Sequence, residues 1–158
     1  MSKIYPELFK LYFDGCSKGN PGHAGIGAVI YSNNEEMWSG CKFIGHKTNN
    51  ESEYSALIFG LEEALKLGIS DLLVYGDSLL VINQMTKKYQ VKSESLYVLN
   101  LRANELIKLL KSVSFNHVYR NENKRADELS NIALHVSIED NLVSNKLKHS
   151  FLPEIKKA

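Results

Sequence analysis

The chain has 158 residues, of which 44% are hydrophobic and 23% charged, with only 10 Gly and 3 Pro. This is the length of one domain, and the composition excludes collagen, a coiled-coil rod and wholesale disorder. No run of 18 apolar residues is present, and Cys16 and Cys41 are not in a C-x-x-C spacing. A membrane span, a disulfide framework and a zinc site are therefore excluded. We expect a soluble intracellular protein, in a compartment that the sequence does not define, with no membrane partner.

The formal net charge is only +1, but the charges are unevenly distributed along the chain. Residues 1–83 carry 6 basic and 10 acidic side chains, whereas residues 84–158 carry 13 and 8. This asymmetry is compatible with ordinary surface scatter and with a polyanion that lies across one side of the fold. Nothing in the pattern indicates an obligate protein partner.

The first part of the chain is predicted to form three strands, in residues 9–13, 24–32 and 37–44, because its apolar residues alternate or are interrupted by glycines. The pair Asp14-Gly15 is interpreted as the end of the first strand. A loop rich in Gly, Asn and Pro separates the first two strands, which favours an antiparallel pair. The third strand is expected to follow as a meander.

From residue 50 the pattern changes to a helical one, in which apolar residues recur at steps of three and four up to residue 67. Asn50 and Glu53 have the spacing of a capping box, so the helix is expected to begin there. Strands and helices then alternate, with strands predicted at 71–76 and 113–119 and helices predicted at 77–85, 96–110 and 123–136.

Together these elements predict one α/β domain with a mixed sheet in residues 8–136. Residues 137–158 show little periodic pattern and are expected to form a peripheral or partly disordered tail. The glycine-rich stretch 19–27 is not interpreted as a nucleotide-binding loop. No Gly-Lys-Ser/Thr follows it, and the next element is a strand rather than a helix whose N-terminus could bind phosphate.

Four acidic residues stand at predicted strand ends or helix starts, namely Asp14, Glu53, Asp77 and Asp127. Each taken alone is compatible with a structural role, as a turn residue, a helix N-cap or a partner of the helix dipole. If the first and fourth strands are adjacent and parallel, however, Asp14 and Asp77 emerge side by side. A helix start that bears Glu53 needs only to lie over the same edge of the sheet.

Clustered carboxylates need a counter-charge. Two of them about 4 Å apart repel each other by roughly 4 kcal/mol at an effective dielectric constant near 20. A site of three or four acids without His or Cys is an oxygen-only site, which suits Mg²⁺ or Mn²⁺ and not zinc. Two such ions about 3.5–4 Å apart activate a water and stabilise the leaving oxygen in phosphodiester hydrolysis.

Four segments, in this order, resemble the motifs of type 1 ribonuclease H. Residues 13–22 (FDGCSKGNPG) with AGIG at 24–27 resemble its opening signature, and 48–53 (TNNESE) resembles its T-N-N-x-x-E helix start. YGDS at 75–78 is similar to its S/T-D-S strand end, and NKRADEL at 123–129 to its final N-x-x-A/C-D-x-L helix. The resemblance covers roughly residues 8–135.

The resemblance implies a ribonuclease H-like fold, a five-stranded mixed sheet flanked by helices. It also implies a metal-dependent endonuclease that cuts the RNA strand of RNA–DNA hybrids and leaves 3′-hydroxyl and 5′-phosphate ends. Two Mg²⁺ ions, with Mn²⁺ as the alternative, would be bound by the four acids, and Asp14 would bridge both ions. RNA 2′-hydroxyls would be read by the loop after the first strand, and the DNA phosphate and minor groove by the T-N-N segment. By this correspondence the substrate-binding residues are Ser17, Lys18, Gly19, Asn20, Thr48, Asn49 and Asn50.

The chain also departs from the family pattern. His117 falls within a predicted strand rather than in the flexible loop where many members carry a histidine. Arg120 resembles the arginine that replaces this histidine in the compact, archaeal-like branch, and it is a candidate second-tier catalytic residue. We expect no basic handle helix, and no separate hybrid-binding module in the residues before the first strand. The expected replacement for gripping the duplex is the set Lys87, Lys88 and Lys92, although an exposed polar loop explains these lysines equally well.

Two other functions remain open on the sequence. The first is a related nuclease of the same fold that acts on another duplex. The second is a non-catalytic nucleic-acid-binding module that has kept the fold. A dead copy is expected to have lost at least one of the acids, and all four are present, so catalysis is favoured.

Overall fold

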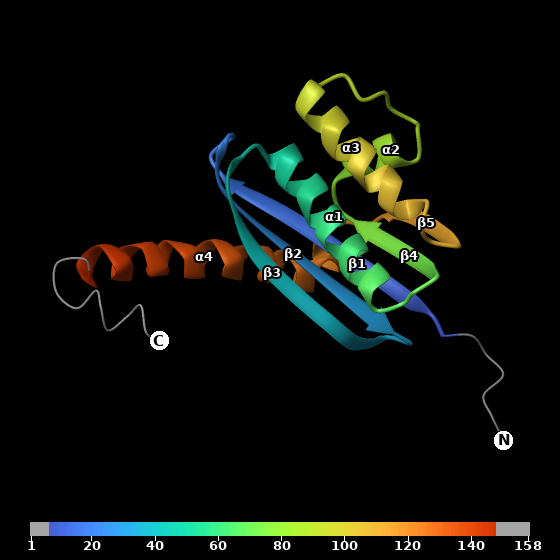
Figure 1. The fold of residues 1–158 in the computed structure, drawn as a ribbon, viewed down its shortest axis with the longest axis horizontal. Helices are drawn as coiled ribbons and strands as arrows, with labels where there is room; N and C mark the ends of the chain where they lie inside the picture. The colour runs from blue at the N-terminus through green and yellow to red at the C-terminus, as the bar shows by residue number, and fades with distance from the viewer. Residues whose placement is uncertain (1–6, 148–158) are drawn as a thin grey trace.

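The protein was analysed as a computed structural model, which describes residues 7–147, with side-chain burial described up to residue 136. A five-stranded sheet in the order β3-β2-β1-β4-β5 forms its centre (Figure 1). The first three strands are antiparallel, and β4 and β5 run parallel to β1, which confirms the predicted mixed sheet. The strands are β1 (Phe9–Lys18), β2 (Gly22–Ser32), β3 (Glu35–Lys47), β4 (Asp71–Gly76) and β5 (Ser112–His117).

Helices cover both faces of this sheet. The helices are α1 (Asn49–Lys66), α2 (Leu79–Met85), α3 (Glu94–Ile107) and α4 (Lys124–Leu147), with a 3₁₀ turn, η1, at Arg120–Glu122. Helix α1 packs on one face of the sheet beside α3, and α4 crosses the opposite face over β1, β2 and β3 (Figure 1). The main core lies under α1 and includes the fully buried Leu11, Phe13, Tyr54, Leu57, Leu61 and Val74.

Strand β1 is longer than the sequence predicts. Its pairing with β4 stops at Phe13 opposite Gly76, but its hairpin pairing with β2 continues to Lys18 opposite His23. The prediction that Asp14 ends the strand is therefore wrong. Pairing with the antiparallel strand β2 extends β1 beyond the point at which its pairing with the parallel strand β4 stops. Asp14 lies instead where β1 passes the carboxyl end of β4.

The capping box of α1 lies two residues earlier than predicted. The Oγ1 atom of Thr48 accepts a hydrogen bond from the backbone N–H of Glu51 at 3.1 Å, and the N–H of Thr48 donates to Glu51 Oε1 at 2.9 Å. Threonine at the N-cap with glutamate three residues later is a favoured combination. The consequence is that Glu53 takes no part in capping and its side chain is available elsewhere.

Helix α4 lies unusually close to the sheet because two positions of β2 carry no side chain. A Cβ atom added at Gly25 would lie 2.4 Å from the carbonyl oxygen of Ser130, and one added at Gly27 would lie 2.6 Å from that of Ala126. Glycine allows such close approach of two backbones. At the start of the helix, Asn123 Nδ2 also donates to the carbonyl oxygen of Phe13 at 2.9 Å, one residue before Asp14.

The structure extends the last helix beyond the predicted range, since α4 continues to Leu147. The rest of the predicted tail, residues 148–158, lies outside the described residues.

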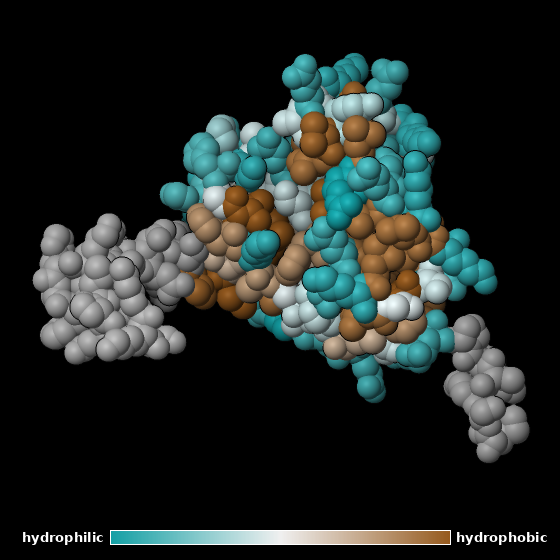
Figure 2. Space-filling view, in the orientation of Figure 1, coloured by the Kyte–Doolittle hydropathy of each residue, from teal (hydrophilic) through white to brown (hydrophobic). Residues whose placement is uncertain are grey.

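None of the helices in the described part of the chain has the length and apolarity needed to cross a membrane. Apolar side chains do gather on the outer surface of α3 (Figure 2), where Tyr97, Val98 and Leu101 are exposed.

Candidate active site

A cleft of about 530 Å³ lies at the carboxyl end of β4. Segments that are far apart in the sequence line it: the middle of β1, the first turns of α1, the residues after β4, and the connection from β5 to α4. Ligands of open parallel or mixed sheets bind at this end of the strands, where the chain changes direction. Polar residues predominate among those that line it, including Asp14, Glu53, Asp77, Asn49, Asn50 and Arg120.

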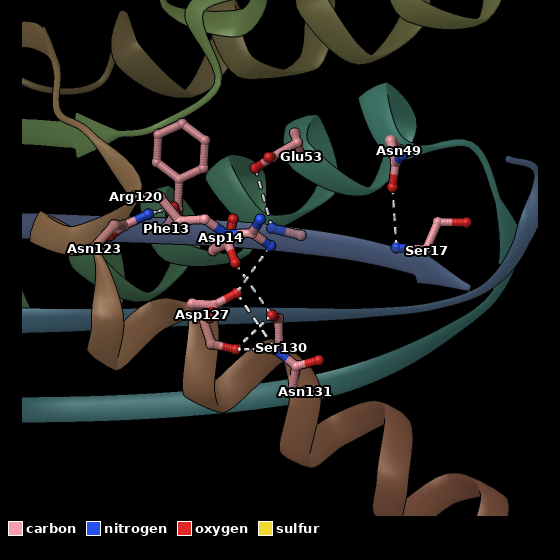
Figure 3. A network of polar contacts seen from close by, with 11 residues as sticks. Phe13, Asp14, Ser17, Asn49, Glu53, Arg120, Asn123, Asp127, Ser130 and Asn131 are labelled. Carbon is pink, nitrogen blue, oxygen red and sulfur yellow. Dashed lines mark hydrogen bonds and ion pairs between the residues drawn. The ribbon is translucent and has the colours of Figure 1, made fainter. Parts of the chain in front are cut away.

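Three carboxylates meet in this cleft. One oxygen from each of Asp14, Glu53 and Asp77 lies within 4.8 Å of the others. Asp14 comes from β1 and Asp77 directly follows β4, so their proximity results from the parallel pairing of these strands. Glu53 reaches the cleft from α1, and its Oε1 atom accepts a hydrogen bond from the N–H of Gly15 at 3.1 Å (Figure 3). This bond holds the Glu53 carboxylate against β1.

The fourth acid, Asp127, approaches Asp14 from the other face of the sheet. It belongs to the first turn of α4, and its charge contributes to the raised pKa of Asp14. Its Oδ1 atom also lies 3.9 Å from the guanidinium of Arg120, which is 81% exposed (Figure 3). The structure therefore groups three of the four predicted acids, with Asp127 near Asp14 and Arg120 beside Asp127.

The environment disfavours full ionisation of this cluster. Burial raises the pKa of Asp14 to about 8, and the nearby charges of Asp77 and Asp127 contribute to the same shift. Burial also raises the pKa of Glu53 well above its usual value, followed by the charges of Asp14 and Asp77, while Arg120 acts weakly in the opposite direction. Carboxylates that keep protons at neutral pH are stabilised in their charged form by a bound cation.

The donor set fits a hard divalent cation. The grouped ligand atoms are carboxylate oxygens only, without histidine or cysteine, which is the chemistry that Mg²⁺, Mn²⁺ and Ca²⁺ prefer. An alternative role for Asp77, the N-cap of α2, is excluded by the structure. The cap is Ser78, whose Oγ atom accepts from the N–H of Val81 at 3.3 Å.

The predicted RNA-reading loop is joined to the start of α1. The N–H of Ser17 donates to Asn49 Oδ1 at 3.1 Å, and the N–H of Asn49 donates to Asn20 Oδ1 at 3.0 Å. Of the seven residues predicted here, three line the cleft, namely Ser17, Asn49 and Asn50. The others, Lys18, Gly19, Asn20 and Thr48, are sequence neighbours of these three and lie outside the cleft lining.

The predicted gripping residues are further away. Lys87, Lys88 and Lys92 are exposed in the connection between α2 and α3, and none of them lines the cleft. This connection contains no helix, in agreement with the predicted absence of a handle. The structure therefore does not group these lysines with the carboxylates.

Several residues near the site were not selected from the sequence as site residues, among them Cys16 and Ser78 in the cleft lining. His117 is the last residue of β5, as its predicted strand assignment required, yet it lines the cleft together with Tyr119. Ser130 is fully buried, and its hydroxyl lies beside Asp14. A signal for Ser130 was present, because it is three residues after Asp127 and therefore on the same face of the helix.

Known proteins share this fold and these segments. The family described as Reverse transcriptase-like matches residues 12–133. Ribonuclease HI of Halobacterium salinarum is 43% identical over 124 residues, which are 78% of this chain and 62% of that protein. The chain thus spans less than two thirds of this curated relative.

Solved structures agree with the sequence comparison. The crystal structure of RNase H1 from Halobacterium salinarum superposes with a TM-score of 0.79 at 41% identity and covers 81% of this chain and 98% of that one. LC11-RNase H1, solved in complex with an RNA/DNA hybrid, gives a TM-score of 0.79 at 34% identity, with coverage of 82% and 99%. The chain belongs to the ribonuclease H family, within the reverse transcriptase-like group.

Proposed function

We propose that the chain is a metal-dependent endoribonuclease that hydrolyses the RNA strand of RNA–DNA hybrids and leaves 3′-hydroxyl and 5′-phosphate ends. The observation that carries this proposal is the convergence of Asp14, Glu53 and Asp77 within 4.8 Å, with Asp127 near enough to Asp14 to contribute to its raised pKa. Three acids from three distant segments have no structural reason to gather in one cleft, because their mutual repulsion costs stability. Membership of the ribonuclease H family supports the same activity.

Divalent cations, which we propose to be two Mg²⁺ ions with Mn²⁺ as a substitute, would be held by the four carboxylates. When bound, such ions lower the pKa of a water and stabilise the leaving oxygen of a phosphodiester. The chain's own contribution is to fix the ligands. The N–H of Gly15 holds Glu53, and burial of Asp14 excludes water from one side of the carboxyl group. Arg120, at the cleft wall, supplies a positive charge beside Asp127 and is proposed to attract the phosphate backbone.

Recognition of the hybrid is proposed to begin at the bonded unit of Ser17, Asn20 and Asn49. The bonds from Ser17 to Asn49 and from Asn49 to Asn20 fix the loop relative to α1. The same set would include Lys18, Gly19, Thr48 and Asn50. An A-like duplex presents its 2′-hydroxyls and base edges in a wide, shallow minor groove, which polar side chains and backbone groups on such an edge can read. Lys87, Lys88 and Lys92 would add contacts to phosphates away from the cleft.

The test is a cleavage assay with the purified chain on end-labelled substrates of one sequence. We expect cleavage of RNA in an RNA–DNA hybrid in the presence of Mg²⁺, and none after chelation. Duplex RNA, duplex DNA and single-stranded RNA should resist. Equal cleavage of single-stranded RNA would reject the recognition account, and preference for duplex RNA would indicate a related nuclease. Binding of the hybrid without cleavage in either Mg²⁺ or Mn²⁺ would indicate the non-catalytic module.

A further inference from the structure

A buried hydroxyl lies between the Asp14 carboxylate and a backbone carbonyl of α4. Ser130 of α4 is 0% exposed. Its Oγ atom lies 2.8 Å from the carbonyl oxygen of Asp127 and 3.3 Å from Asp14 Oδ2 (Figure 3). A serine hydroxyl has one proton and two lone pairs, so it donates to one of these oxygens at a time.

The position of Ser130 is set by backbone packing, and its hydroxyl is oriented by its contacts with Asp127 and Asp14. Ser130 belongs to the segment of α4 that lies against the glycines of β2, where a Cβ at Gly25 would come within 2.4 Å of the Ser130 carbonyl oxygen. The helix therefore cannot move closer to the sheet. Its first turn is tied to β1 through Asn123 and Phe13. Ser130 Oγ consequently remains at a fixed place beside Asp14.

We propose that Ser130 is a positioning residue, which orients the Asp14 carboxylate for divalent-cation binding by engaging its Oδ2 atom. The proposal rests on the proposed function, since it concerns the same cluster. A carboxylate rotates readily about its last torsion, which has broad energy wells. When the Ser130 hydroxyl donates to Oδ2 rather than to the Asp127 carbonyl oxygen, it removes this freedom before the cation arrives. Outer hydrogen-bond partners of metal ligands typically change metal affinity by about 10–100-fold when they are removed.

The primary test is Mg²⁺ binding to the purified chain without nucleic acid, measured by titration calorimetry. For Ser130→Ala we expect a dissociation constant raised about tenfold. The matched control is Ser112→Ala, because Ser112 Oγ also donates to an aspartate, Asp71, at 2.6 Å, but at the opposite end of β4. The control should bind Mg²⁺ as the unmodified chain does. Wild-type affinity in Ser130→Ala would overturn the proposal.

Melting without metal separates positioning from a merely structural role. Alanine favours helix, so Ser130→Ala should melt at the same temperature as Ser112→Ala in chelator. A weaker affinity that accompanies a lower metal-free melting temperature would overturn the proposal in favour of a packing role. Should Ser130→Ala fail to fold, reduced Ser130→Cys keeps a side chain of similar shape with a weaker donor. Unchanged Mg²⁺ affinity in that variant would equally overturn it, and a raised dissociation constant would support it.

Rescue gives a second readout. Ser130→Thr restores the hydroxyl and should return the Mg²⁺ dissociation constant toward that of the unmodified chain, and a folded Ser130→Thr that stays weak would contradict the proposal. Failure of the proposed function has a different signature. If the unmodified chain binds Mg²⁺ but cleaves no hybrid, the proposed activity is refuted. The Mg²⁺ affinities of Ser130→Ala and the unmodified chain still decide the role of Ser130 in that case.

Discussion

The carboxylate cluster and the lysine loop between α2 and α3 are built in opposite ways. In the cluster Asp14 is buried while Glu53 and Asp77 are half-buried, with Glu53 held by β1 and Asp14 contacted from α4. Lys87, Lys88 and Lys92 are exposed and stand outside the cleft. Under the proposed function, bond cleavage would depend on groups placed before the substrate arrives, whereas the duplex would be gripped by lysine side chains that adjust to it. Changes in the two regions should therefore affect different kinetic constants.

The largest effect is expected from Asp77→Asn in the cluster. The change removes one charge and a good cation ligand at nearly constant shape, so cleavage of the hybrid should fall by at least about a hundredfold. The metal-free protein should be no less stable, because a repelling charge has gone. The measurements are kcat on a labelled hybrid and melting in chelator. The matched control is Asp71→Asn, at the exposed start of the same strand, and an Asp77→Asn rate near that of the control would end the assignment.

The second effect is a pH dependence of stability that is specific to the metal-free protein. The pKa of Asp14 is about 8 in the folded chain, against an ordinary 3.8. Between these values the folded state binds a proton that the unfolded chain has released, so the free energy of unfolding should fall as the pH rises from about 4 to 8. Mg²⁺ binds the folded state only and should restore stability at pH 8.

Thermal melts at pH 5, 6.5 and 8, each with chelator and with Mg²⁺, would check this prediction. The gain from Mg²⁺ should be largest at pH 8, where fewer protons compete with the cation. A melting temperature that rises with pH in chelator would show that the cluster is not the source of the dependence.

The smallest effect is expected in the lysine loop. Replacement of Lys87, Lys88 and Lys92 by glutamine should raise KM a few-fold, leave kcat unchanged, and reduce the slope of log affinity against log salt by up to about three. Lys111→Gln is the control, since Lys111 is exposed immediately before β5, at the opposite end of that strand from the cleft. An unchanged salt slope would show that these lysines do not contact phosphates. A fall in kcat would show that they also affect the cleavage step.

Much of the fold was predictable because the apolar periodicity changes where the elements change. The three early strands, the alternation that follows and the absent handle all agree with the structure. The errors concern boundaries that neighbours decide. Pairing with β2 extends β1 to Lys18, and Thr48 competes successfully with Asn50 as the N-cap of α1. The pairing with β2 is not visible in a local window, whereas Thr48 and Glu51 have the same capping-box spacing as Asn50 and Glu53, so the local pattern alone does not choose between them.

In the site, the four acids were predicted because their motifs place them at strand ends and helix starts. Ser130 was missed for a physical reason. Its partner Asp14 is 116 positions away, and a serine inside a helix usually faces solvent or its own backbone. The lysine-bearing segment between α2 and α3 was correctly predicted to be a loop. Its distance from the cleft depends on how α2 and α3 pack, which no residue pattern specifies.

The glycines at positions 25 and 27 have a consequence for how variants of this chain should be interpreted. Neither has any chemistry to offer, yet a side chain at either would meet the α4 backbone at 2.4 to 2.6 Å and push the helix outward. Asp127 and its neighbours would move with it. A survey of inactive variants should therefore recover these two glycines alongside the acids, and positions that fail in such a survey are not all positions that touch the scissile bond.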